Sequence, residues 1–203
     1  MKKLLALAIL GLTAVSSWAQ GTVTFQAGLL VTFPTLADRY VYADAAHTTK
    51  LTGTNYAAGL YFGDAATLGN WGGTLAVTAT GAPGLFKFRP VTTTLPGTWN
   101  TSSPIAPATS GATLTLPGVD VGGSTMLQVR VWDFVKYTSF ADAVSHNDYG
   151  ASDAFAFSVP TAGATPDKYY MDGMRAFNLV PEPSTIALGV LGAIGLLAIR
   201  RRK

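Results

Sequence analysis

An apolar segment lies near each end of this chain, and the two segments confine the folded body to the residues between them. At the N-terminus, two lysines precede an apolar run from Leu4 to Val15, and residues 17–19 place small side chains where a signal peptidase must accommodate them. We expect residues 1–19 to be a secretory signal peptide that is cleaved between Ala19 and Gln20. An uncleaved anchor is the alternative, but the run is short for a membrane span.

The C-terminal apolar segment, Ile186 to Ile199, has 14 residues and no charged side chain. At about 1.5 Å per residue, a helix of this length covers roughly 21 Å, against roughly 30 Å of hydrocarbon in a bilayer. We expect a single transmembrane helix over residues 185–199 that crosses marginally; a buried core helix is the alternative. The basic residues after it favour the membrane, because cations of this kind stay on the cytoplasmic side. These cations are Arg200, Arg201, Arg202 and Lys203.

The formal net charge of +3 comes from the two ends of the chain. The stretch from Gln20 to Val180 carries eight basic and ten acidic side chains, so its own net charge is −2. It therefore has no basic patch for a nucleic acid. The chain has no cysteine, which excludes disulfides, a cysteine nucleophile and thiolate metal sites. We expect no cofactor and no nucleic-acid partner.

Between the two ends, short runs of alternating apolar and polar residues are separated by Gly, Pro and Asx turns, which is typical of β-strands. We expect an all-β ectodomain over residues 20–179, built as an antiparallel β-sandwich or jelly roll. The clearest strand is Thr125–Phe134, in which Leu127, Val129 and Val131 alternate with Gln128, Arg130 and Trp132. Trp132 is expected to face outward with Arg130.

Two further segments receive a local prediction. The stretch from Pro96 to Gly111 is rich in Thr, Ser and Pro and is expected to be a linker. One or two helical turns are expected from Ser139 to Ser145, because Phe140, Ala143 and Val144 share a helical face.

The residues from Val180 to Lys203 resemble a PEP-CTERM sorting signal. The triplet Pro181-Glu182-Pro183, the apolar span and the basic end occur in the order of that signal, in a chain that also begins with a signal peptide. Two prolines keep the backbone around Glu182 extended and out of helices and central strands, so a protease can reach it. A proline hinge above an ordinary anchor is the alternative.

The resemblance implies processing by an exosortase, a membrane-embedded cysteine protease-transpeptidase. This enzyme would remove the tail and release the domain or transfer it to another carrier. The partners would then be signal peptidase, exosortase and, transiently, the inner membrane. The final location would be the cell surface or the extracellular matrix, in an exopolysaccharide or biofilm setting.

The densest polar cluster of the body surrounds His146. Asp142 and His146 at i, i+4 on one helical face, with Asp148, are candidate metal ligands, and a solvated helix end is the alternative. Ser145 and His146 are adjacent and are expected to point in different directions, and no Gly-x-Ser-x-Gly motif occurs. The body has no glutamate to serve as a glycosidase acid. We expect a protein without enzymatic activity, and a metal-dependent hydrolase ranks well below.

Aromatic residues in turn-like or loop-like contexts are candidates for stacking on sugar rings. They are Trp71, Trp99, Tyr169 and Tyr170. Aromatic side chains also commonly cover the ends of a β-sandwich, which is the alternative. The sequence thus favours a non-enzymatic exported matrix protein first, and a carbohydrate-binding module acting on extracellular polysaccharide second.

Overall fold

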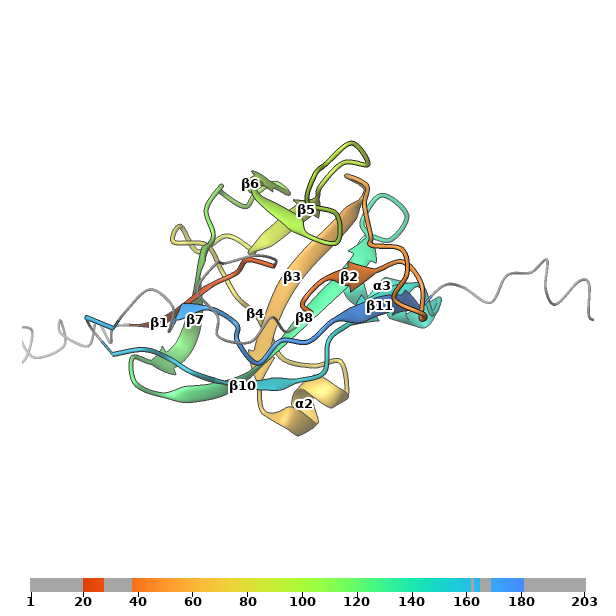
Figure 1. Ribbon diagram of the computed structural model, residues 1–203. Coiled ribbons are helices and arrows are strands. Elements are labelled where there is room, and N and C mark those ends of the chain that lie inside the picture. The colour runs from red at the N-terminus through yellow and green to blue at the C-terminus, as the bar shows by residue number, and fades with distance from the viewer. Residues whose placement is uncertain (1–19, 28–37, 162, 165–168, 181–203) are drawn as a thin grey trace, which may run out of the picture.

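The computed structural model describes residues 20–27, 38–161, 163–164 and 169–180 (Figure 1). The predicted signal peptide, the triplet Pro181-Glu182-Pro183, the helix expected over residues 185–199 and the basic tail lie outside these residues. Within the described part of the chain, no helix is long and apolar enough to cross a membrane. Its elements, in chain order, are β1 (Gln20–Thr24), β2 (Val41–Tyr42), β3 (Tyr56–Gly63), α2 (Ala65–Gly69), β4 (Thr74–Leu75), β5 (Leu85–Phe88), β6 (Trp99–Pro104), β7 (Thr113–Asp120), β8 (Ser124–Asp133), α3 (Phe140–Ser145), β9 (Tyr149–Ala151), β10 (Phe155–Ser158) and β11 (Phe177–Val180).

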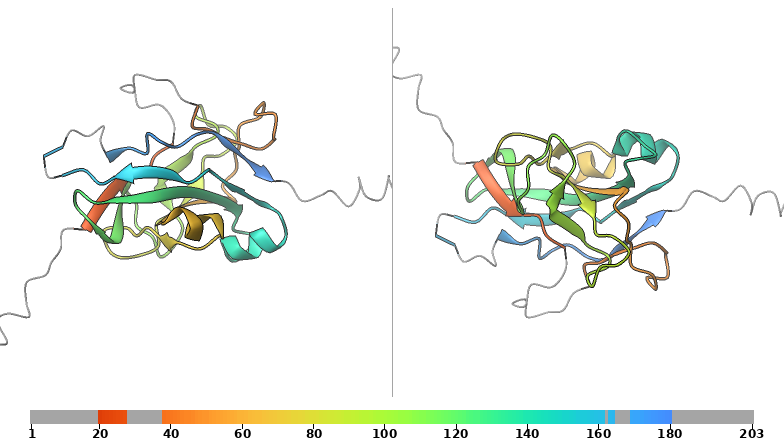
Figure 2. Two further views of the ribbon diagram at one scale, coloured as in Figure 1. Left: turned by 90° about the horizontal axis from the view of Figure 1, so that it is seen from below. Right: turned by 90° about the horizontal axis from the view of Figure 1, so that it is seen from above.

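Most of the strands belong to one strongly curled mixed sheet (Figures 1 and 2). Its order is β2-β11-β9-β8-β3-β5-β6, while β10 also pairs with β8 and β4 with β3. The long strands β3 and β8 form its centre, in antiparallel register from Tyr56 opposite Asp133 to Gly63 opposite Met126. Strands β1 and β7 form a separate antiparallel pair.

The main hydrophobic core lies between the β1–β7 pair and the large sheet, because apolar side chains from both belong to one buried cluster. Leu127, Val129 and Val131 of β8 contribute one face of their strand to this cluster, as the alternation predicts. Phe86 and Phe88 of β5 are also buried there, since alternate residues of a strand point to the same side.

A smaller cluster covers the opposite face of β8, here called the outer face. It contains Ala57 of β3, Trp132 of β8, and Phe140 and Ala143 of α3. Helices α2 and α3 lie on this same side of β3 and β8 (Figure 2). Both faces of the central strand are therefore buried.

The outward placement expected for Arg130 and Trp132 is wrong. Their side chains are only 1% and 3% exposed. They do alternate with the core residues of β8, as predicted, but the face they point to is covered by α2 and α3. The alternation in the sequence predicts which residues share a face of the strand. It does not predict whether that face is covered by another element or exposed to solvent.

The predicted β-rich class is confirmed, with three corrections. The predicted linker from Pro96 to Gly111 contains β6, which pairs with β5. The sheet is not wholly antiparallel, because β2 and β11 pair in parallel. The five-residue helix α2 was not expected. The helix predicted at Ser139–Ser145 is confirmed as α3, with Ser139 as its N-cap.

Candidate functional sites

The C-terminal strand β11 is held on both sides. Phe177 and Asn178 pair with β2, and Leu179 and Val180 pair with β9. The next residue in the sequence, Pro181, has no N–H to donate to a strand ladder. The predicted sorting triplet therefore begins at the first residue after the sheet, with no spacer between them.

The start of β1 and the end of β11 lie at opposite ends of the molecule (Figures 1 and 2). β1 begins at Gln20, the residue that signal-peptide cleavage would make the first of the mature chain. The two processing events predicted from the sequence would thus act at opposite ends of the folded body.

A buried guanidinium organises the outer face. Arg130 donates hydrogen bonds from Nη1 to the carbonyl of Trp71 at 3.0 Å and from Nη2 to the carbonyl of Gly72 at 2.6 Å. Its Nε donates to Oε1 of Gln128 at 2.8 Å. The guanidinium carbon lies 4.1 Å from the ring centroid of Tyr61 and 5.0 Å from that of Phe140. Carbonyl dipoles and ring faces therefore stabilise the charge in place of a carboxylate.

Burial lowers the pKa of Arg130 to about 10, and the nearby Tyr61 partly opposes this shift. The guanidinium still carries its positive charge at neutral pH. Desolvation by the same packing raises the pKa of the Tyr61 hydroxyl.

Trp71 is the exposed aromatic of this face, with 37% of its surface accessible. It follows α2, and its ring meets those of Phe140 and Tyr149 in edge contacts, with centroids 5.6 and 5.0 Å apart. Sequence reasoning singled out Trp71 and missed these two neighbours. They lie about 70 and 80 residues further along the chain, and only the packing of α3 and β9 brings them near.

The other three aromatic candidates are not placed beside Trp71. Trp99 is 1% exposed, and its indole N–H donates to the carbonyl of Phe25 at 3.1 Å. The loop-like context predicted for Trp99 is therefore wrong, because this residue begins β6 and faces the main core. Tyr169 and Tyr170 are half-buried, and Tyr170 forms a bridge with Thr24 of β1.

The polar cluster at α3 is only partly assembled. Asp142 and His146 share one face as predicted, with Nδ1 of His146 3.7 Å from Oδ1 of Asp142. Asp148 is directed elsewhere, because its Oδ2 pairs with Nζ of Lys136 at 3.0 Å. Among the residues that the structure describes, no three His, Cys, Asp or Glu side chains are grouped to hold a metal ion.

Ser145 and His146 do not point apart, contrary to expectation. Oγ of Ser145 lies 3.0 Å from Nδ1 of His146, the same ring nitrogen that faces Asp142. A Ser-His-Asp triad needs the serine and the carboxylate on opposite ring nitrogens, so that the imidazole can take a proton on one side while the carboxylate orients the other. Ser145 also donates to the carbonyl of Asp142 at 2.7 Å.

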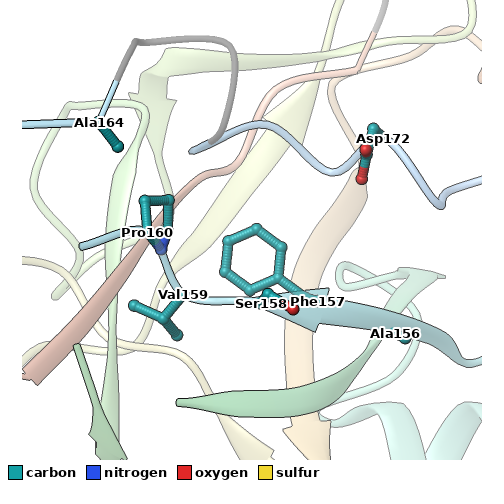
Figure 3. A pocket seen from close by; sticks show the side chains of 7 residues that line it. All are labelled: Ala156, Phe157, Ser158, Val159, Pro160, Ala164 and Asp172. Carbon is teal, nitrogen blue, oxygen red and sulfur yellow. The ribbon is translucent and has the colours of Figure 1, made fainter. Parts of the chain in front are cut away.

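A pocket of about 380 Å³ lies beside β10 (Figure 3). Residues of β10 and of the segment after it line the pocket, together with Ala164 and Asp172. Among the described residues that line it, Asp172 is the only one with a charged side chain.

The comparison with protein families finds a match at the C-terminal end of the chain. Residues 179–203 match the PEP-CTERM protein-sorting motif. The predicted resemblance is confirmed, and the matched region begins within β11 and includes the triplet. The chain thus carries the signal of an exosortase substrate, which implies export and a C-terminal sorting signal anchored in the membrane before the protein reaches the surface. No curated protein and no solved structure is similar enough to this chain to match it.

Proposed function

We propose that this chain is a non-enzymatic surface or extracellular-matrix protein that is released from its membrane tail by an exosortase and associates with exopolysaccharide in a biofilm. The observation that carries the proposal is the sorting motif over residues 179–203, placed immediately after the folded body. A signal peptidase would process the other end, between Ala19 and Gln20. The inner membrane is then a transient location.

The proposed lack of enzymatic activity is supported by the geometry of the polar groups. The Ser145–His146 contact uses the wrong ring nitrogen for a triad, and Asp148 is engaged by Lys136. Of the described residues that line the pocket beside β10, only Asp172 is charged. A metal-dependent hydrolase would require a ligand set that the described residues do not assemble.

The mass of the mature protein tests both processing steps at once. In a host that contains an exosortase, we expect the secreted form to begin at Gln20 and to lack the apolar segment. Changing Pro181, Glu182 and Pro183 to alanine should leave the tail attached and the protein in the membrane fraction. A full-length tail on the unmutated protein in such a host would contradict the proposal.

Association with polysaccharide has its own test. In a biofilm-forming host, we expect the processed protein to sediment with the matrix and to appear in the medium when exopolysaccharide synthesis is deleted. An unchanged distribution in the deletion strain would exclude polysaccharide as the attachment.

A carbohydrate-binding module is the second candidate function. The observation that favours it is the clustering of the exposed Trp71 with Phe140 and Tyr149 on the outer face. Direct binding through this surface would explain how the protein is retained in a matrix.

A further inference from the structure

The end of α2 has a well-defined hydrogen-bond pattern. The N–H of Trp71 donates to the carbonyl of Leu68 at 3.1 Å, and the N–H of Gly72 donates to that of Thr67 at 2.9 Å. These two bonds form a Schellman motif, in which Asn70 is the C-cap and the residue after it takes a left-handed backbone conformation.

The residue in that left-handed position is Trp71, whose φ is +59°. A glycine usually occupies this position, because a side chain with a Cβ is disfavoured there. Two glycines, Gly72 and Gly73, follow directly in the sequence, yet the bulky indole stands at the strained position. The turn would form more easily with a glycine at this position. The strain at a partly exposed tryptophan therefore suggests that the indole has a function of its own.

Arg130 holds the backbone of this turn through hydrogen bonds to its carbonyl groups. Its Nη1 and Nη2 donate to the carbonyls of Trp71 and Gly72 at 3.0 and 2.6 Å, and Nη2 lies 3.4 Å from that of Leu68. The guanidinium carbon is also 5.8 Å from the centroid of the Trp71 ring. Because the arginine itself is buried in the sheet, the indole is held on a rigid support.

We propose that Trp71 is a preorganised stacking platform for a single pyranose ring of a polysaccharide, and that Arg130 is a positioning residue that holds the platform in place. This proposal rests on the proposed association with polysaccharide. The C–H groups on one side of a pyranose form a flat apolar surface of about the size of an indole. A rigid indole loses little conformational entropy when it binds such a ring.

The surroundings of Trp71 favour a sugar over a protein partner. The large apolar side chains that are exposed in the described residues come from five separate parts of the chain. They are Trp71 after α2, Val91 and Leu95 between β5 and β6, Val121 between β7 and β8, Val135 after β8, and Val180 at the end of β11. A stable protein interface buries about 800 Å² on each partner, which needs a continuous patch. In the cluster that Trp71 forms with Phe140 and Tyr149, only the indole belongs to these exposed large apolar side chains, and this matches a ligand one ring wide.

Binding by the full-length chain in detergent micelles tests the platform, with cellohexaose, chitohexaose and dextran as probes and isothermal titration calorimetry as the readout. We expect at least one probe to bind and Trp71→Gly to weaken its affinity about tenfold or more. Glycine suits the left-handed position, so this variant should unfold at the same denaturant concentration as the unmutated protein or a higher one. Val135→Ala, at an exposed apolar residue of another loop, serves as the matched control and should bind normally.

Two results would contradict the proposal that Trp71 is a stacking platform. One is unchanged affinity in Trp71→Gly, and the other is the absence of binding to all three probes. Either result leaves the sorting of the protein untouched, because the mass of the mature form tests that step separately.

The positioning role of Arg130 is tested by a double-mutant comparison. We expect Arg130→Lys to weaken glycan binding severalfold, because a lysine cannot reach the turn carbonyls with the same set of donors. In the Trp71→Gly background, the same change should have no further effect on binding. An equal loss in both backgrounds would mean that Arg130 acts on the fold in general and not through Trp71.

Discussion

At the residue scale, Arg130 is distinguished by a buried charge that pairs with no carboxylate among the described residues. Burying a cation normally requires a compensating anion, because desolvation of a charge costs several kcal/mol. Here the carbonyls of Trp71 and Gly72, in the turn after α2, and that of Leu68 at the end of the helix replace the anion. The aromatic rings of Tyr61 and Phe140 supply the remaining contacts. The arginine joins α2 to the central strand.

We predict that Arg130→Met lowers the free energy of unfolding by about 2–3 kcal/mol, since the carbonyls at the end of α2 lose their donors while the volume is largely kept. Chemical denaturation followed by circular dichroism would measure it. Lys87→Met on β5 is the matched control, because it removes a cation from a half-buried strand position and should change stability by less than about 1 kcal/mol. Equal effects of the two changes would argue against this role.

Asp44 gives a prediction about pH. Hydrogen bonds from the backbone N–H of Thr48 and Thr49, at 3.0 and 2.6 Å, lower the pKa of this carboxyl from 3.8 to about 2. The folded state therefore favours the ionised form more than the unfolded state does. The stabilisation is complete above about pH 4 and is lost as the pH falls through 2.

Unfolding measured between pH 5 and pH 2 checks this expectation. The stability difference between the unmutated protein and Asp44→Ala should shrink as the pH falls over this range. A difference that stays constant down to pH 2 would show that the carboxylate contributes nothing through its charge.

At the scale of the elements, alternation predicted the long strand β8 well. It was expected near its observed position, because Leu127, Val129 and Val131 form a regular inward set. β6 was predicted as part of a linker, because its sequence, Trp99–Pro104, is mostly Asn, Thr and Ser. Pairing with the neighbouring strand β5, which local sequence does not encode, makes it a strand.

The candidate site around Trp71 could be predicted only in part from the sequence, because contacts between distant segments form it. Trp71 stood out in the sequence, but the residues that support it come from α3, β8 and β9. The short helix α2 has a local signal, since Asp64 caps it by accepting from the N–H of Thr67 at 2.8 Å. A five-residue helix is too short for an apolar periodicity, so that signal alone did not predict it.

The strand β11 yields a prediction about where processing can occur. Phe177 and Leu179 are buried in the main core, and burial of each stabilises the fold by about 1.5–3 kcal/mol. A chain that ends at Val180 should therefore keep nearly the full stability of the body. A chain that ends at Ala176 should lose at least about 3 kcal/mol and should expose the edges of β2 and β9.

Thermal unfolding of the two truncated chains measures this difference. Comparable melting temperatures would mean that β11 is dispensable. The expected result fits a sorting signal that begins immediately after the last residue the fold needs.

At the scale of the whole molecule, the absence of a spacer gives a prediction about the orientation of the body before processing. Only four residues separate Val180 from the helix expected over residues 185–199, and four extended residues span at most about 14 Å. With that helix in the bilayer, we expect the end of the body that carries β11 and α3 to lie against the membrane and the start of β1 to point away from it (Figure 1).

Because the chain has no cysteine, single labels can test this orientation. Val135 follows β8, whose end pairs with β9 next to β11, and it is 74% exposed. Val121 lies at the other end of β8, next to Asp120, which is opposite Gln20 of β1, and it is 38% exposed. A ten-residue strand separates the two sites by roughly 30 Å.

The measurement is the fluorescence of a dye attached to the single cysteine, with the full chain in liposomes that carry nitroxide headgroups. The fluorescence should be strongly quenched when the dye is at Val135→Cys and hardly at all when it is at Val121→Cys. Equal quenching at both sites would mean that the body lies flat on the membrane or tumbles freely, and the short tether would then not set its orientation.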